Sequence, residues 1–409
     1  MTNFTRTFIA LYIATFMSSM GIGILAPILP AYVDQFSVSA LMLGIIFGSY
    51  SAARTLLMPP VGILSDRFGR RRFILSGLTL FTIISPLYAF ATDPYQLIAV
   101  RFLHGIGGAM LMPVAMSAIG DLAPEGKEGF IMGSFTSAFF AGLGFGPLIG
   151  GYMRDMYSMA AAFYSMGVLS CFALLFTILA LPHLPSGKGR EPNLTGLEST
   201  GAAQTLTRIS LDTPLWGLLL FRFSRAVGIG LVWVILPLFA IRSLGISAFK
   251  VGILLSANTF ITTLLQSPAG HLSDKIGHRK SLTAGSVIAC AAVAFIAWAR
   301  DFNELLFVSV ALGLAGALIV PAGTALAVTL GRTRGMGRTM GMYNSSLSMG
   351  TMLGPVIGGA LLDFQGVRTV FISGAVLGIL GWAALMVMFP AKKESELRIE
   401  HSELEIETR

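Results

Sequence analysis

Apolar residues occur along the whole chain in runs of about 20 residues, the length that a helix needs to cross ~30 Å of hydrocarbon. Short polar or basic segments separate these runs. The pattern predicts an all-α integral membrane protein with twelve transmembrane helices. We locate the runs at roughly 7–30, 42–61, 72–91, 95–119, 130–152, 161–181, 214–238, 249–270, 281–299, 304–330, 338–361 and 369–390.

Two signatures in the first half of the chain return 208 residues later. Gly62–Arg72 (GILSDRFGRRR) corresponds to Gly270–Lys280 (GHLSDKIGHRK), and Gly142–Gly151 corresponds to Gly350–Gly359. Similar halves of this kind are typical of transporters that open alternately to the two sides of a membrane. The repeat therefore predicts two pseudo-symmetric six-helix bundles.

The same offset maps Asp155 onto Asp363, so it extends to the ends of the repeated segments. A stretch rich in Pro, Gly, Ser and Thr separates the two copies and is expected to be a cytoplasmic linker. The predicted domains are an N-terminal bundle at 1–181, the linker at 182–213, a C-terminal bundle at 214–390 and a cytoplasmic tail at 391–409.

Composition and charge agree with a membrane protein. Apolar residues make up 54% of the 409 residues and charged residues 12%, too few to cover a soluble surface. With the N-terminus inside, most of the 28 Lys and Arg fall on the cytoplasmic side. Both termini are therefore expected to be cytoplasmic, in a cell (inner or plasma) membrane. The net charge of +8 reflects this topology and does not indicate nucleic-acid binding.

A basic segment follows the second run, and one acid, Asp66, stands among its cations. An acid at the end of an apolar helix needs a cation or the positive end of another helix. Arg70 is one candidate, and Asp121 at the end of the fourth run is positioned to share it. A contact between halves that forms in one conformation only acts as a latch; a loop that merely sets topology is the alternative. The residues assigned to the latch are Gly62, Asp66, Arg67, Gly69, Arg70, Arg71 and Asp121.

The fifth run carries small residues at nearly four-residue spacing: Gly142, Gly146, Gly150 and Gly151, with Pro147 among them. Such spacing gives a smooth helix face for close packing, and the proline favours a kink. A dinucleotide-binding interpretation of these glycines fails because no strand precedes them.

The fourth run contains Arg101 and, three residues later on the same face, His104. The second copy of this run keeps Gly313, Gly316, Ala317 and Pro321 but has Ser309 and Leu312 in place of Arg101 and His104, so the fold does not require the pair. An arginine inside a membrane is costly and indicates function. The ordinary pKa of histidine lies near physiological pH, which favours a proton-carrying role, with a neutral packing role as the alternative.

Three of these segments resemble motifs of the major facilitator superfamily. Residues 62–74 resemble motif A, Leu97–Ala109 resembles motif B, and Gly142–Gly151 resembles motif C, which marks the twelve-span drug:proton antiporters. The second copy departs from motif A at His278, where a base is usual. The resemblance implies two bundles that rock about a midplane cavity lined mainly by the first, fourth, seventh and tenth spans, and it favours proton-coupled export.

Further arginines lie within spans: Arg54 in the second, and Arg222 and Arg225 on one face of the seventh. Asp34 lies at the outer end of the first span, where it either faces the cavity or belongs to a loop. A cavity lined by arginines without a buried carboxylate favours anions or amphiphiles with anionic heads. The predicted substrate and proton cavity thus contains Arg54, Arg101, His104, Arg222, Arg225 and Asp34.

The leading functional prediction is a secondary transporter for proton-coupled efflux of amphiphilic small molecules. The alternative is an exporter or flippase-like carrier of organic anions or anionic lipids; uptake by symport comes third. A membrane enzyme is disfavoured, since the chain has no HExxH, GxSxG or Walker motif and no Cys/His metal cluster. We expect no cofactor or metal, and a monomer whose partners are the substrate, protons and the bilayer.

Overall fold

The computed structural model describes residues 3–122, 128–182, 213–334 and 336–389. Within these ranges 12 helices are long and apolar enough to span a membrane, as the sequence predicts. They are α1 (Asn3–Asp34), α2 (Ala40–Phe68), α3 (Arg70–Leu87), α4 (Pro94–Leu122), α5 (Glu128–Met156), α6 (Met159–Ala180), α9 (Thr213–Leu244), α10 (Ala248–Ile276), α11 (His278–Ile296), α12 (Phe302–Arg334), α13 (Met336–Gln365) and α14 (Val367–Met388), with a short 3-10 turn at Tyr88–Phe90.

Several helices are longer than their apolar runs. The run at 42–61 lies within a helix that continues to Phe68, because the polar end of α2 remains helical beyond the apolar stretch. The predicted linker lies outside the described residues except at its two ends, as does the tail from residue 391. The domain boundaries at these segments therefore stay predictions.

Local signals fix the same helix ends in both halves. Ser39 and Ser247 cap α2 and α10, and each hydroxyl accepts a hydrogen bond from the backbone N–H three residues later. Gly69 and Gly277 end these helices with φ of 98° and 100°, a region that favours glycine. The structure thus repeats the internal symmetry of the sequence down to the caps.

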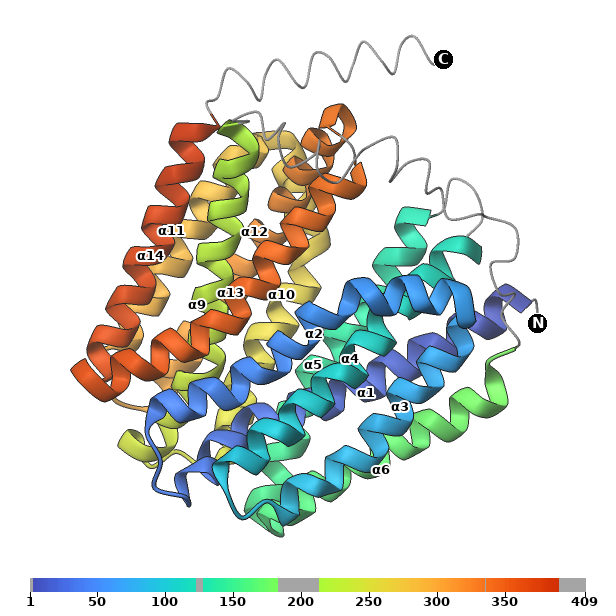
Figure 1. The fold of residues 1–409 in the computed structure, drawn as a ribbon. Coiled ribbons are helices and arrows are strands. Elements are labelled where there is room, and N and C mark those ends of the chain that lie inside the picture. Colours follow the sequence, from blue (N-terminus) through green and yellow to red (C-terminus); the bar gives the residue numbers. More distant parts are fainter. Residues whose placement is uncertain (1–2, 123–127, 183–212, 335, 390–409) are drawn as a thin grey trace.

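The helices form two bundles, one from α1–α6 and one from α9–α14 (Figure 1). Packing within them is equivalent: α1 lies against α5 as α9 lies against α13, and α2 lies against α4 as α10 lies against α12. Between the bundles the main contacts are α2 with α13 and α5 with α10. These two pairs of helices form the seam between the halves.

The seam is tight at one end only. A Cβ added to Gly359 would fall on the carbonyl oxygen of Ala40, and one added to Gly252 would fall on that of Pro147. Here the backbones of the two halves touch, so only glycine fits. Toward the end that holds the start of α1 and the end of α14, the bundles diverge (Figure 1). There an added Cβ at Gly62, Gly133 or Gly341 would meet no atom within 4 Å. One end is closed and the other is open.

Two aspartates fasten the closed end. Asp363, in the last turn of α13, accepts hydrogen bonds of 2.8 Å from the backbone N–H groups of Ala40 and Leu41 at the start of α2. Asp155, in the last turn of α5, accepts one of 2.8 Å from Phe249 at the start of α10. Each carboxylate satisfies unpaired N–H groups and lies at the positive end of a helix in the other half. The pair Asp155 and Asp363, related by the repeat, thus joins the halves at two equivalent points.

Asp363→Ala is expected to loosen the closed end. A lost helix cap costs about 1 kcal/mol, which changes a conformational ratio roughly fivefold. With Cys171 and Cys290 replaced by serine, spin labels at Gln35 and Arg368 report the distance between the halves at this end. We expect the distance distribution to gain a longer component.

Asp93→Ala is the matched control, because Asp93 accepts its 2.6 Å hydrogen bond from Tyr95 within one half. It should leave the distribution unchanged. An unchanged distribution in Asp363→Ala would show that the glycine contacts alone hold the seam.

Candidate functional site

Arg101 is buried within the N-terminal half, with 5% of its surface exposed. Its guanidinium lies over the rings of Phe47 and Tyr50, 5.0 and 4.9 Å from their centroids. Long hydrogen bonds of 3.4 and 3.5 Å reach the carbonyl oxygens of Ile46 and Phe47. Ring faces and carbonyls therefore stabilise this charge in place of an acid.

His104 is 1% exposed and lies in an aromatic cage next to Arg101. Its Nδ1 lies 3.1 Å from the hydroxyl of Tyr88. The rings of Tyr50, Phe81 and Tyr88 meet the imidazole edge to face, with centroids 4.6 to 5.9 Å away. Neither Arg101 nor His104 lines either of the cavities described below, so their contact with a substrate or a proton path stays a prediction.

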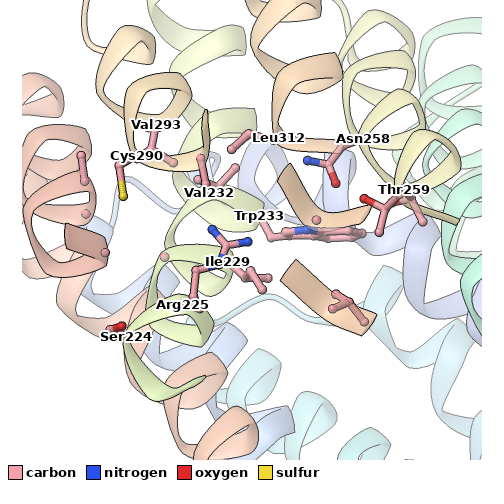
Figure 2. Close-up of a pocket in the computed structure, with 18 of the residues that line it drawn as sticks. Ser224, Arg225, Ile229, Val232, Trp233, Asn258, Thr259, Cys290, Val293 and Leu312 are labelled. Carbon is pink, nitrogen blue, oxygen red and sulfur yellow. The ribbon is translucent and has the colours of Figure 1, made fainter. Parts of the chain in front are cut away.

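A cavity of about 210 Å³ lies mainly in the C-terminal half (Figure 2). Its walls come from α9, α10, α11, α12 and α14. Phe140 and Leu143 of α5 close it from the other half. The lining is mostly apolar, and Figure 2 shows Arg225, Trp233 and Asn258 among the side chains that form it. We call it the C-terminal cavity.

Arg225 is the charged residue among the described residues that line the C-terminal cavity. Its Nε is buried and has no hydrogen-bond partner among them. No Asp or Glu belongs to the described lining. A buried donor without a partner costs about 1–3 kcal/mol, and more when it carries charge. The C-terminal cavity is therefore an apolar space with one cationic side chain in its described lining.

A smaller cavity of about 20 Å³ lies in the N-terminal half, and we call it the N-terminal cavity. It is lined by Arg54 together with Thr15, Ser18 and aromatic residues. The Nε of Arg54, the Oγ1 of Thr15 and the Oγ of Ser18 are buried and without partners in the described part of the chain. The space admits little more than water.

Arg222, predicted with Arg225 on one helix face, lies apart from the C-terminal cavity. Its guanidinium lies over the ring of Tyr343 on α13, 4.5 Å from the centroid. Its Nε is also buried and unpartnered among the residues described. The side chain of Asp34 lies outside the described residues. Of the predicted cavity residues, the structure thus places Arg225 and Arg54 on cavity walls, in different halves.

The predicted latch is at the open end. Arg70, the expected partner, contacts Asp66 at 2.9 Å and also donates to the carbonyl of Ser117 at 2.8 Å. Arg71 donates to the carbonyls of Leu181 and Ile178. These contacts stay within the N-terminal half, and the Asp66 side chain is 61% exposed. The other latch residues follow: Arg67 lies over the Phe68 ring, Gly62 and Gly69 face open space, and the side chain of Asp121 lies outside the described residues.

The glycines of α5 face two neighbours. An added Cβ at Gly142, Gly146 or Gly150 would collide with carbonyl oxygens of α1. One at Gly151 would collide with that of Ala248 on α10. The helix continues through Pro147, whose carbonyl lies against Gly252 of α10. This row of glycines, which we call the glycine ladder, therefore lets α5 pack closely against both its own bundle and the other one.

Sequence reasoning missed two features. The caps by Asp155 and Asp363 were visible only as a repeated residue without a role. Trp233 and Asn258 were unremarkable residues within apolar runs. A residue-by-residue comparison of the halves at the 208-residue offset carries the signal for both.

Comparison with known proteins shows which family the chain resembles. The family model for the "Major Facilitator Superfamily" matches residues 11–224 and 218–406. An uncharacterized MFS-type transporter of Methanocaldococcus jannaschii is 29% identical over 371 residues, covering 90% of this chain and 95% of the relative. Multidrug resistance protein 2 of Bacillus subtilis is 23% identical over 391 residues, covering 95% of this chain and 96% of the relative.

Solved structures share the fold. A bacterial homologue of the human lysosomal transporter Spinster, inward-facing and unoccupied, aligns with a TM-score of 0.80 at 17% identity, covering 95% of this chain and 97% of that one. The nucleoside transporter NupG aligns with a TM-score of 0.73 at 16% identity, covering 94% of this chain and 99% of that one.

Tyr88→Phe is expected to destabilise the protein. It removes the hydroxyl that bonds the buried imidazole of His104, and a buried group left unpaired costs about 1–3 kcal/mol. Thermal unfolding of the purified protein, followed by intrinsic fluorescence, should show a lower melting temperature. Tyr157→Phe, at a tyrosine that is 71% exposed, is the control and should change nothing. Equal melting temperatures for all three proteins would show that the bond contributes nothing to stability.

Proposed function

The chain belongs to the major facilitator superfamily of membrane transporters, and from that premise we propose that it exports amphiphilic small molecules in exchange for protons by alternating access. The observation that best supports this proposal is the contact between the halves along the seam. It is closed by backbone contact at Gly44, Gly151, Gly252 and Gly359 and open at the other end. A seam of this kind supports rocking of two rigid bundles.

The distribution of Lys and Arg supports an orientation with the open end in the cytoplasm. In that orientation the structure is inward-open, and cargo enters from the cytosol or the inner leaflet. The caps by Asp155 and Asp363 then close the outer end. Export requires these contacts to break while the open end closes.

The chemistry of the C-terminal cavity supports an amphiphilic cargo. Apolar and aromatic side chains surround a few polar groups, as in binding sites for small organic molecules. Relatives named as multidrug resistance proteins match nearly the whole chain. We assign the cargo site to this cavity because it also touches α5 of the other half.

We assign proton coupling to Arg101 and His104. They are a charged and a titratable group on one helix, and the second half lacks both. If Nδ1 is the acceptor, protonation of His104 would turn Nδ1 into a donor and require the Tyr88 hydroxyl to reorient and accept, so protonation and packing are linked. The second candidate function, export of organic anions or anionic lipids, is favoured by the unpaired Nε atoms of Arg54, Arg222 and Arg225.

Inside-out vesicles with an acid interior test coupled export. The probes share one body and differ in the head: 4-phenylbutanesulfonate, 4-phenylbutanol and 4-phenylbutyltrimethylammonium. A pH-sensitive dye should report loss of the gradient with at least one charged probe, because protons leave as cargo enters. Arg101→Ala vesicles with equal amounts of inserted protein should show no loss. A gradient that survives all three probes in wild-type vesicles would contradict proton-coupled efflux of such amphiphiles.

Asp66→Asn is expected to slow transport without lowering stability or cargo affinity. The exposed pair with Arg70 contributes only about 0–1 kcal/mol, whereas a latch acts when the open end closes. Initial transport rates and melting temperatures should be measured on the same preparations. Asp274→Asn, in the second copy, is the matched variant and should slow transport less, because His278 stands where Arg70 stands in the first copy. Unchanged transport rates in Asp66→Asn would remove the latch.

A further inference from the structure

The two cavities occupy equivalent places in the two halves. Residues lining the smaller one map, at the 208-residue offset, onto residues lining the larger one. The corresponding pairs are Tyr50 with Asn258, Arg54 with Thr262, Phe81 with Ala289, Gly108 with Gly316, and Met112 with Val320. The C-terminal cavity is therefore the hollow counterpart of a filled site.

The difference in volume follows from side-chain size. In the N-terminal half the rings of Tyr50 and Phe81 enclose His104. The second half has asparagine, alanine and leucine at these places. Large-to-small changes leave space because the surrounding helices relax only partly. The N-terminal half thus fills this place with side chains, whereas the C-terminal half leaves a cavity there that a guest molecule would occupy.

The charge in the hollow copy is also specific to it. Arg225 corresponds to Met17 in the first half, so the fold does not require an arginine there. Hydroxyls of the lining are already engaged: those of Ser224, Thr259 and Thr262 donate to the carbonyls of Phe221, Leu255 and Gly313. The Nε of Arg225 has no such partner among the described residues. Because Arg225 lines the cavity, a guest would meet the guanidinium of this residue.

We propose that the C-terminal cavity binds an amphiphile with a single anionic head, which Arg225 holds while the apolar body packs between Trp233 and the aliphatic wall. A guanidinium pairs with sulfonate or carboxylate oxygens through parallel charge-assisted hydrogen bonds. The inference deepens the proposed export function, on which it rests, by naming the charge of its cargo.

The same geometry disfavours a cationic guest. An ammonium head would lose its water next to a buried guanidinium, with no carboxylate in the described lining to offset the repulsion. A neutral guest gains only the apolar contacts. Binding should therefore follow the order sulfonate, alcohol, ammonium for probes with the same body.

The guest would also touch both halves. Phe140 and Leu143 of α5 form part of the wall, and Leu143 lies within the glycine ladder. Nearby, Ser256 of α10 donates a 2.6 Å hydrogen bond to the carbonyl of Gly144. A guest in the cavity would therefore contact side chains of α5 next to the seam about which the halves are proposed to rock.

Calorimetry on the full chain in lipid nanodiscs, with empty nanodiscs as blank, tests the site with the three phenylbutyl probes. We expect Arg225→Gln to weaken sulfonate binding roughly 10- to 100-fold, the effect of losing a hydrogen bond to a charged group, with little change for the alcohol. The sulfonate affinity of Arg225→Lys should lie between that of the wild type and that of Arg225→Gln, because lysine keeps the charge but not the paired donors. Arg368→Gln, at an exposed arginine, controls for net charge.

A second variant tests the cavity itself. Ala289→Phe restores the side chain that the first half accommodates as Phe81, so it should abolish binding of both the sulfonate and the alcohol while the protein still folds. Ala289→Leu fills less of the space and should weaken binding less. Sulfonate affinity that is unchanged in Arg225→Gln, or lost in Arg54→Gln instead, would overturn the assignment.

Binding and transport outcomes separate the two proposals. If the ammonium probe discharges the gradient in vesicles and the sulfonate does not bind, the anion site falls and coupled export stands. If the sulfonate binds through Arg225 and no probe discharges the gradient, the site stands and coupled export falls. Protection of Cys290, a lining residue, from N-ethylmaleimide in a Cys171→Ser background locates the bound sulfonate independently of either result.

Discussion

The arrangement of the whole protein depends on backbone contact between its halves at one end. A side chain does not fit at four glycines of the seam, because a carbonyl of the opposite half occupies the position of the Cβ. These are Gly44 and Gly359 between α2 and α13, and Gly151 and Gly252 between α5 and α10. At this end Asp363 and Asp155 also cap helices across the seam. Close contact at one end fixes the divergence at the other, and with it the access to the interior.

The two halves share the same arrangement of helices but differ in the side chains at their centres. Caps, turns and seam glycines match between the halves, because both copies must form the same helices and the same contacts. The centres do not match: one is packed with Arg101, His104 and aromatic rings, and the other is hollow around Arg225. The N-terminal centre holds larger side chains, and the C-terminal centre has smaller ones at the equivalent positions. The functional differences between the halves are therefore concentrated at a few equivalent positions.

The helices could be predicted from the sequence, because an apolar run near the thickness of a bilayer has few alternatives. The pairing of Asp66 with Arg70 could also be predicted, since an acid among cations at the end of an apolar helix needs a cationic partner nearby. The positions of Arg101 and His104 could not, because which way a helix face points depends on its neighbours in space. A cavity is harder still: it is made by side chains that are absent, and no local pattern records an absence.

The uncompensated charge of Arg225 has an electrical consequence. In the proposed site, a bound anion would lower the net positive charge within the bilayer by one relative to the carrier without it. A membrane voltage acts on a charge that moves through it by about 2.3 kcal/mol per elementary charge for each 100 mV crossed. In the proposed exchange, the anion-loaded form and the proton-carrying return form would therefore respond differently to the membrane voltage, because the bound anion offsets the charge of Arg225 in only one of them.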